Sequence, residues 1–600
     1  MQQLPFRVSA VLFDFDDTLT EPGSIDFLAI RRALGCPTDR SILEYIQELD
    51  DPAERERALT TLGRMEQEAA AGSRPNAAAE QVVRWLKSRA LPVGILTRNG
   101  RDAICRALQN FPTLGAGDFQ AVVTREDPAQ PKPDPGGVLL AAERMGVPAG
   151  ELLVVGNYVF DIEAGRRAGA VTVLLQHSDA LDAGYAEGAR ANSRAGAAGG
   201  FAPGRRHPDG VLEPAPDFII TDLADLPRLV RSGLPLPAGK YPCELLEEYL
   251  DGLPNDDPSV VVGPHVGRDV CGVAVRPSTL LALGADPITF TTDALGHYAV
   301  VVNANDIAAS GATPRWFLAT VLMPQGSTPS HVQAVLHDLR DACRRRGVSL
   351  CGGHTEITDA VTRPVVSGMM IGTAGDRGLL DKRGMRSGDA LLLTKRVAVE
   401  GTALLAGELG AELSEKGLTA AELLTCRNLL QQLSVVDEAR IAADFDGVSA
   451  MHDVTEGGLA TAIAELAAAG RHSLSVDLDA IPYYPPTRRL CEVLGLDPLG
   501  LMGSGSLLIC CRSDQAAALR GALAAARVEA EVIGRVLGVD EAAAAPALET
   551  GALDTTASTG RRAAQAAAAV IALRGGRRVP WPVFKVDEVA RALSGAAHRA

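Results

Sequence analysis

The chain has 600 residues, 46% of them hydrophobic and 22% charged, and its formal net charge at pH 7 is −16. This composition is globular and excludes wholesale disorder, collagen and a simple coiled coil, and the length predicts about four domains. An acidic chain lacks the basic face that nucleic acid binding requires, whereas acidic groups suit Mg²⁺ and magnesium-bound phosphate esters.

Signals for export and for membrane insertion are missing from the sequence. No apolar run reaches the roughly 20 residues of a membrane helix, and Met1–Phe13 lacks the features of a signal peptide. The ten cysteines form no C-x-x-C pair, so we expect neither a zinc or redox motif nor a disulfide scaffold. These features predict a cytoplasmic protein with no membrane partner.

The first part of the chain alternates short apolar runs with helical stretches. This alternation predicts a Rossmann-like α/β domain with a doubly wound parallel sheet over residues 1–231. Residues 21–90 are helical and charged and predict a small helical cap, whereas residues 177–210 show no period and predict a mobile loop. The expected strands are Val8–Phe13, Val93–Leu96, Leu152–Val155 and Val171–Leu175.

A second α/β module follows a linker at residues 232–240, which is rich in proline and glycine. We expect one domain at residues 241–380, another at 381–540, and a low-complexity, alanine-rich tail at 541–600. The strands expected in the first of these domains are Val260–Val275, Ile288–Thr292, Tyr298–Val302 and Pro364–Gly372.

Two aspartates follow the first predicted strand. Asp14 and Asp16 lie at the carboxyl end of a parallel strand, where doubly wound folds bind ligands, and can converge on one metal or phosphorus. Asp14 would act as the nucleophile and Asp16 as the proton shuttle. Later strand ends carry a hydroxyl, a cation and oxygen donors suited to phosphate and Mg²⁺. Each alone would more often be structural, but their order points to one site: Thr97, Lys132, Asn157 and Asp161.

These motifs resemble the haloacid dehalogenase superfamily of aspartate-nucleophile phosphatases over about residues 5–230. The resemblance implies a mobile cap, Mg²⁺ as cofactor, and Thr97 and Lys132 as phosphate binders. The cap resembles that of phosphoglycolate-phosphatase-like members, which implies a small phosphorylated metabolite as substrate. Asn157 stands where the family has Asp and offers an oxygen without charge. Either metal affinity is lowered, or this half has kept only a binding role.

Acidic and amide residues also gather at turns of the second half. Carboxylates can hold the Mg²⁺ ions that neutralise a triphosphate, and glycine turns let the backbone approach it. The helix expected after Gly458 presents an N-terminus that favours an anion. We therefore predict a Mg²⁺–ATP site and a phosphate or substrate loop. The ATP-site candidates are Asp269, Asp293, Asn303, Asn305, Asp306, Gly352, Gly353 and Glu356, with Asp269 and Asp293 also as metal ligands; the loop candidates are Asp453, Gly457 and Gly458.

The segments at residues 303–312 and 452–460 resemble the superfamily of aminoimidazole-ribonucleotide synthetase, thiamine-monophosphate kinase, selenophosphate synthetase and the nitrile-forming protein of hydrogenase maturation. Over residues 241–540 the resemblance implies two α/β domains, a homodimer formed through this half, and transfer of the γ-phosphate of ATP. The nitrile-forming branch presents a cysteine at its C-terminus, whereas the last cysteine here is Cys511. We therefore do not expect that particular chemistry.

Together these patterns predict a bifunctional enzyme, a Mg²⁺-dependent phosphatase joined to an ATP-dependent synthetase or kinase. Two alternatives stay open. In one, the phosphatase-like half is a regulatory binding module, as Asn157 would allow. In the other, the protein is an ATP-switched factor for assembling a metal centre.

Overall fold

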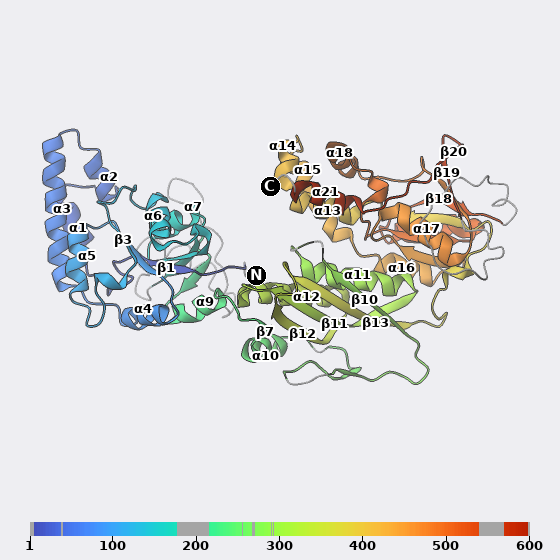
Figure 1. Cartoon of the computed structure of the whole chain (residues 1–600), viewed down its shortest axis with the longest axis horizontal. Coiled ribbons are helices and arrows are strands. Elements are labelled where there is room, and N and C mark those ends of the chain that lie inside the picture. The colour runs from blue at the N-terminus through green and yellow to red at the C-terminus, as the bar shows by residue number, and fades with distance from the viewer. Residues whose placement is uncertain are drawn as a thin grey trace. The chain divides into compact units, whose positions relative to one another are not determined.

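The computed structural model describes residues 5–37, 40–176, 215–254, 256–266, 270–289, 291, 293–538 and 569–597. The chain forms two compact units (Figure 1), residues 1–237 with 326–334, and residues 238–325 with 335–600. Asp269 and the predicted loop at 177–210 lie outside the described residues. Within the described ranges, no helix is long and apolar enough to cross a membrane.

A six-stranded sheet with the order β3-β2-β1-β4-β5-β6 forms the core of the first unit. All of its pairs are parallel, which confirms the predicted Rossmann-like sheet. The chain order reverses between β1 and β4, so their carboxyl ends border the crevice where such sheets bind ligands. The strands are β1 Ala10–Phe13, β2 Val93–Leu96, β3 Ala121–Val123, β4 Leu152–Gly156, β5 Val171–Leu175 and β6 Phe218–Ile220.

Helices cover both faces of this sheet. On one face Val83, Ile104 and Val230 belong to a shared hydrophobic core with the strands, and on the other Val138 and Ala164 do the same. Burial on both sides explains why the strands are almost continuously apolar. The helices are α4 Ala79–Ser88, α5 Arg101–Leu108, α6 Gly136–Met145, α7 Val159–Arg167 and α9 Leu226–Ser232.

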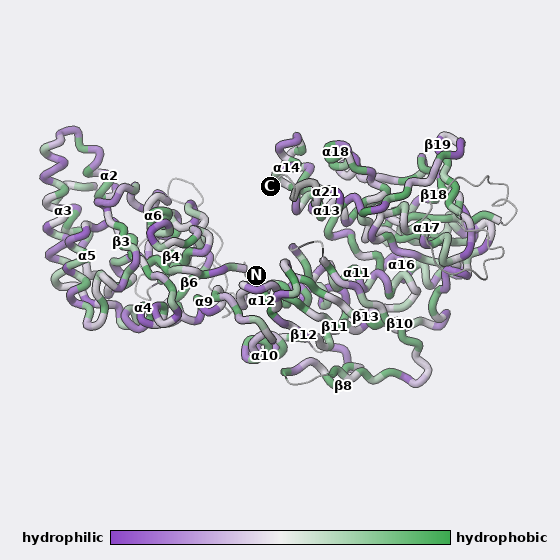
Figure 2. Tube along the Cα trace, viewed as in Figure 1, coloured by the Kyte–Doolittle hydropathy of each residue, from purple (hydrophilic) through white to green (hydrophobic). Residues whose placement is uncertain are grey.

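The helical cap is smaller than predicted. It consists of α1 Phe27–Leu34, α2 Ile42–Gln47 and α3 Pro52–Gly72, which share a small core around Ile30, Ile46 and Leu62. α3 is largely hydrophilic (Figure 2), and it begins where the Asp51 side chain accepts a hydrogen bond from the Ala53 amide. The prediction that the cap runs to residue 90 is wrong, because α4 packs into the core of the sheet.

A five-stranded sheet, β10-β13-β11-β12-β7, forms the first domain of the second unit. α11 lies on this sheet, and a Cβ added to Gly372 of β13 would meet the Ile307 side chain of α11. A separate two-stranded ribbon joins β8 to β9. The strands are β7 Gly239–Lys240, β8 Val260–Val262, β9 Gly272–Val273, β10 Leu281–Ile288, β11 Ala312–Pro324, β12 Ser349–Thr358 and β13 Val365–Ala374; the helices are α10 Cys243–Asp251, α11 Leu295–Ala309 and α12 Pro329–Arg346.

The second domain contains a seven-stranded sheet, β15-β17-β14-β18-β16-β19-β20. Its largest core includes Leu393, Ile463 and Leu508, and α17 is mostly hydrophobic (Figure 2). The strands are β14 Ala390–Thr394, β15 Val448–Asp453, β16 Leu474–Asp477, β17 Leu507–Cys511, β18 Ala530–Val536, β19 Val570–Arg574 and β20 Arg577–Val579; the helices are α13 Val399–Glu408, α14 Gly410–Glu415, α15 Ala420–Asn428, α16 Val436–Ala443, α17 Gly458–Gly470, α18 Pro485–Leu494, α19 Ala516–Ala525 and α21 Glu588–Ala597.

Further predictions about the second half are wrong. The strand expected at Ile288–Thr292 is one of them, because β10 ends at Ile288. Tyr298–Val302, expected as a strand, lies inside α11. The tail expected at 541–600 contributes β19, which pairs in parallel with β16, and α21, whose Val589 is fully buried. The linker expected at 232–240 contains β7, which pairs with β12.

Candidate functional site

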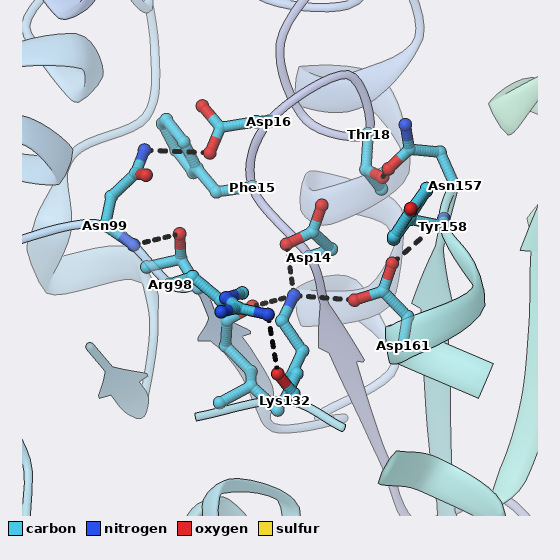
Figure 3. Close-up of polar contacts among 12 residues, drawn as sticks. Asp14, Phe15, Asp16, Thr18, Arg98, Asn99, Lys132, Asn157, Tyr158 and Asp161 are labelled. Carbon is cyan, nitrogen blue, oxygen red and sulfur yellow. Dashed lines mark hydrogen bonds and ion pairs between the residues drawn. The ribbon is translucent and has the colours of Figure 1, made fainter. Parts of the chain in front are cut away.

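A lysine joins two carboxylates at the carboxyl edge of the first sheet (Figure 3). The Lys132 Nζ lies 2.5 Å from Asp14 Oδ1 and 2.6 Å from Asp161 Oδ1. Asp14 follows β1, and Asp161 lies in the first turn of α7, directly after β4. Lys132 also donates to the carbonyl oxygen of Leu96, the last residue of β2, at 3.0 Å. Three of the predicted site residues therefore meet where β1, β2 and β4 end.

The electrostatics of this cluster are those of buried, mutually compensating charges. Burial raises the pKa of Asp14 to about 7, and the Lys132 charge opposes that rise. Burial alone would lower the pKa of Lys132, but the Asp14 and Asp161 carboxylates raise it above its ordinary value. Lys132 therefore remains a cation, and it holds Asp14 close to the point at which that carboxylate gains or loses a proton.

Asp16 lies close by, on the side of the cap. Its carboxylate accepts a hydrogen bond of 2.8 Å from Asn99 Nδ2 (Figure 3), and it lines a small cavity together with Phe15 and Glu66 of α3. Burial raises the pKa of Asp16 well above its ordinary value, with further contributions from Asp14 and Asp17. A carboxyl group whose pKa is raised holds its proton more firmly than an ordinary aspartate, which suits the role of general acid.

The remaining predicted residues of this half surround the same centre. Thr97 is buried directly after β2, and its hydroxyl accepts a hydrogen bond from the Asn99 amide at 3.1 Å. Asn157, in the turn after β4, accepts a hydrogen bond from the Thr18 hydroxyl at 3.3 Å. The Asp161 carboxylate is taken by Lys132 and by the Tyr158 amide, at 3.0 Å. Asp14 and Asn157 are therefore the predicted ligands whose side-chain oxygens suit a hard cation such as Mg²⁺.

Sequence reasoning missed two residues that connect the cap to this centre. Arg98 follows Thr97 and pairs with Glu44 of α2 at 2.5 Å. Glu66 of α3 is buried, pairs with Arg125 at 2.5 Å and accepts a hydrogen bond from the Gly100 amide at 3.2 Å. Glu66 and the Glu44 partner of Arg98 both lie in charged, helical sequence, where exposure is the ordinary expectation, so no sequence signal marked these contacts.

In the second unit, the structure brings three carboxyl groups together. Asp306 of α11 hydrogen-bonds with Asp286 of β10 and with Asp453, the last residue of β15. Burial raises the pKa of Asp306 to about 9, followed by the effects of Asp453 and Asp286. We call Asp286, Asp306 and Asp453 the carboxyl trio. Two of its members were predicted, whereas Asp286 was missed because it lies inside a strand.

The trio is short of hydrogen-bond donors. The Asp453 Oδ2 atom is buried and has no hydrogen-bond partner in the described part of the chain. An unsatisfied buried oxygen costs about 1–3 kcal/mol, and a divalent cation with its phosphate ligand would satisfy it. The described ranges contain no group of three or more His, Cys, Asp and Glu side chains that could hold a metal ion, so the phosphate oxygens of the ligand would have to supply the remaining coordination.

Asn303 and Asn305 of α11 were predicted to contact the nucleotide, and the structure gives them another role. The Asn303 amide accepts from the Asp286 backbone N–H at 2.9 Å and donates to the Asp286 carbonyl oxygen at 3.1 Å. The Asn305 amide bonds in the same way to Leu433 and Val435. Both side chains are fully buried. They position the segments around the trio, and the predicted ligand contact is not supported.

The other ATP-site candidates are not gathered at the trio. Asp293 is exposed in the turn before α11. Gly352, Gly353 and Glu356 lie on β12, which β11 and β13 separate from β10. A Cβ on Gly353 would lie 1.9 Å from the Ala319 carbonyl oxygen of β11, so strand packing alone requires this glycine. Glu356 pairs with His354 at 3.0 Å on the same strand.

The predicted phosphate loop precedes α17, but its backbone already binds a carboxylate side chain of the protein. Gly457 and Gly458 have φ values of 73° and 65°, which favour glycine. The Gly457 amide donates to Asp587 Oδ2 at 2.7 Å, and burial raises the pKa of Asp587 although backbone amides oppose it. The site expected for a ligand phosphate thus holds a carboxylate that sequence reasoning did not identify.

Comparisons with known proteins divide the chain in the same way. Residues 8–169 match the model of haloacid dehalogenase-like hydrolases. Residues 267–374 match the N-terminal domain and residues 386–545 the C-terminal domain of AIR synthase related proteins. A hydrolase of Saccharomyces cerevisiae is 32% identical over 174 residues, 28% of this chain and 78% of the relative.

Relatives of the second half carry names from hydrogenase maturation. Carbamoyl dehydratase HypE of Cupriavidus necator is 29% identical over 267 residues, 43% of this chain and 72% of the relative. A crystal structure of hydrogenase maturation protein HypE in complex with ATP aligns with a TM-score of 0.44 and 22% identity, over 56% of this chain and 92% of that one.

Proposed function

Because residues 8–169 belong to the haloacid dehalogenase-like hydrolases and the second half to the AIR synthase related proteins, we propose that this chain is a bifunctional enzyme. Its first half is a Mg²⁺-dependent phosphatase for a small phosphate ester. Its second half uses ATP to phosphorylate or activate a small metabolite. The observation that carries the first proposal is the bridge from Asp14 through Lys132 to Asp161.

The side chains around Asp14 can perform phosphoryl transfer in two steps. A carboxylate oxygen of Asp14 attacks phosphorus, the bond to the leaving oxygen breaks, and an aspartyl phosphate forms. Asp16 supplies the proton that the leaving oxygen takes. In the second step Asp16 takes a proton from water, whose oxygen attacks phosphorus and frees Asp14 and inorganic phosphate. Lys132 offsets negative charge throughout.

Asp14 and Asn157 are the side chains that would hold Mg²⁺ in this half. The ion would supply positive charge that offsets repulsion between the phosphate dianion and the carboxylates. Asn157 contributes an oxygen without charge, so Asp14 is the charged member of the pair. This donor set supports Mg²⁺ binding that is weaker than a pair of carboxylates would give.

An Asp14→Asn substitution tests the phosphatase. We expect p-nitrophenyl phosphate hydrolysis to fall by about a thousandfold or more, because the amide is a poor nucleophile. Asp102→Asn, in an exposed position of α5, is the matched control and should retain full activity. Intact-mass measurement after brief exposure to substrate should detect a covalent phosphate on the parent protein and none on Asp14→Asn. Equal rates for the two proteins would refute the phosphatase proposal.

The carboxyl trio supports ATP use by the second half. Burial raises the pKa of Asp306 and of Asp453, and Mg²⁺ would displace a proton from either carboxyl group, as metals do when they bind carboxylates. Cys510 and Cys511 are fully buried in β17, and burial raises the pKa of Cys511 to about 11. Neither of these two cysteines supplies a thiolate, and we propose kinase or synthetase chemistry for this half.

Screening small metabolites for ADP release with Mg²⁺–ATP tests this half. With a true substrate, the Asp306→Asn protein should release no ADP. The Asp376→Asn protein should release ADP as the parent does, because Asp376 is exposed in a turn of the same domain. ADP release that is equal in both variants would place the ATP chemistry away from the trio.

A second candidate function follows from Asn157. In this alternative the first half binds a phosphorylated metabolite without turnover and signals to the ATP-using half. Asn157→Asp distinguishes the two: a rise in phosphatase activity from near zero favours the binding module, and a small change favours the enzyme. The name of the Cupriavidus relative supports a further alternative, an ATP-switched factor in metal-centre assembly. It would require partner binding that changes with Mg²⁺–ATP.

We propose that the second half forms a homodimer through the face of the β10–β13 sheet opposite α11. Gly284 and Gly368 lie toward α11, so Leu283 and Met369 point to the other face. Their relative exposures are 59% and 40%. Apolar side chains exposed on the same face of adjacent strands are typical of interfaces between subunits.

A further inference from the structure

Arg98 is a second cation beside the phosphatase centre, next to Lys132 (Figure 3), and three neighbouring groups hold it. Its Nη2 pairs with Glu44 of α2 at 2.5 Å, and its Nη1 donates to the Lys132 carbonyl oxygen at 2.9 Å. The guanidinium carbon lies 5.2 Å from the centre of the Phe160 ring, in the first turn of α7. The side chain is 20% exposed, so the guanidinium is fixed in place yet reachable.

The two cations at this edge have different tasks available to them. Lys132 is buried and committed to the two carboxylates of the reaction centre. Arg98 follows Thr97 directly and is held to the backbone of Lys132 itself, so it lies next to the phosphoryl-binding residues without contacting Asp14. Its present partner is an anion of the chain, the Glu44 carboxylate, whose side chain is 43% exposed.

We propose that Arg98 binds a second anionic group of the substrate, a carboxylate or a second phosphate, in the place that Glu44 now occupies. This inference rests on the proposed phosphatase function and narrows its substrate class to phosphate esters that carry another anion. Arginine's planar fork matches carboxylate and phosphate oxygens in pairs. Glu44 is a replaceable partner, because a half-exposed ion pair contributes little to stability.

The neighbouring groups fix the Arg98 guanidinium in place, which favours a role in binding the substrate over a purely structural role. The Phe160 ring and the Lys132 carbonyl oxygen orient the guanidinium without neutralising its charge. If the Glu44 carboxylate is displaced, no further rearrangement of Arg98 is required. The same exchange breaks a link between α2 and the turn after β2, so that occupancy of the subsite and the position of α2 become coupled.

The test compares matched substrates that differ by one anionic group. 3-Phosphoglycerate and glycerol 1-phosphate differ by a carboxylate, and ribulose 1,5-bisphosphate and ribulose 5-phosphate differ by a phosphate. For each pair, the ratio of kcat/KM values measures how strongly the enzyme prefers the second anion. Arg98→Met should lower the larger of the two ratios by roughly 10- to 100-fold, the loss expected for a hydrogen bond to a charged group. Arg98→Lys should restore part of that preference.

Two further variants separate recognition from structure. Glu44→Gln frees Arg98 and should lower KM for the favoured substrate that carries two anionic groups by about 2- to 5-fold. Arg64→Met removes an exposed arginine from α3, 61% exposed, and should leave every ratio unchanged. The pair of substrates whose ratio falls in Arg98→Met identifies the second anion as carboxylate or phosphate.

The outcome is decisive even if the phosphatase proposal fails. If the parent protein shows no turnover, calorimetric dissociation constants for the same four compounds give the same ratios, and their fall in Arg98→Met supports the subsite. Ratios that stay unchanged in Arg98→Met, by kinetics or by binding, overturn the inference and leave Arg98 as a structural link between α2 and the sheet.

Discussion

Replacing Lys132 by methionine removes the cation between Asp14 and Asp161. Both contacts are short, at 2.5 and 2.6 Å, and the lysine is 5% exposed. Removing one partner of a buried ion pair costs about 3–5 kcal/mol, because the remaining charge is left uncompensated. With about 2–4 °C for each kcal/mol in a unit of this size, the melting temperature should fall by roughly 6–20 °C at pH 8.

The loss should depend on pH in a defined direction. The pKa of Asp14 in the folded protein is raised to about 7 from 3.8. A group with a raised folded pKa stabilises the protein at low pH, and this contribution is lost as the pH rises through the folded value. Without Lys132 the pKa of Asp14 rises further. We therefore expect the penalty of the substitution to fall by at least half between pH 8 and pH 5.5, as the Asp14 carboxyl group accepts a proton.

Urea unfolding with pulsed hydrogen exchange, read by mass spectrometry on peptides of β1 and β4, isolates the first unit within the full chain. Lys87→Met is the matched control, because Lys87 pairs with Asp118 at the surface, with a side chain that is 36% exposed. It should cost no more than about 1 kcal/mol at either pH. A Lys132→Met protein as stable as the control at pH 8, or one whose penalty does not shrink at pH 5.5, would refute the compensation argument.

Asn157→Asp adds a charge to the proposed Mg²⁺ ligands, so the Mg²⁺ concentration that half-saturates phosphatase activity should fall by about tenfold or more; an unchanged value would remove Asn157 from the ligand set. Asp306→Asn should abolish the rise in melting temperature that Mg²⁺–ATP produces in the parent, and calorimetry with Asp376→Asn provides the comparison. Leu283→Glu and Met369→Glu should each convert a dimer to a monomer in analytical ultracentrifugation. Leu424→Glu, at a residue 60% exposed on α15, should not, and an equal effect of all three would refute the interface.

Buried parallel strands were readable from the sequence because packing on both faces makes them continuously apolar. Val93–Leu96 and Val171–Leu175 have the bounds that the sequence predicted. β3 was missed because it has three residues, too few to show a pattern. The residues at strand ends were equally readable, since topology brings the carboxyl ends of parallel strands to one edge, and Asp14, Lys132 and Asp161 meet there.

The predictions that were wrong or missing concern features that no local sequence pattern marks. The run Tyr298–Val302 is rich in β-branched valine, and α11 is buried on nearly every side, so it shows no helical period. β19 depends on pairing with β16, almost a hundred residues earlier in the chain, and its alanine-rich surroundings carry no local signal. Asp286 was missed because its role arises only when Asn303 clamps its backbone beside Asp306.

The carboxylate of Asp587 ties the end of the chain to the turn that leads from Asp453 into α17. It accepts hydrogen bonds from the amides of Gly457, Met502 and Val589, and so fastens three separate stretches with one side chain. A truncation before Asp587 would therefore do more than trim an appendage. It would remove the hydrogen bond that holds the Gly457 backbone close to Asp453 of the carboxyl trio. The segment around Asp587 therefore stabilises the ATP-using half.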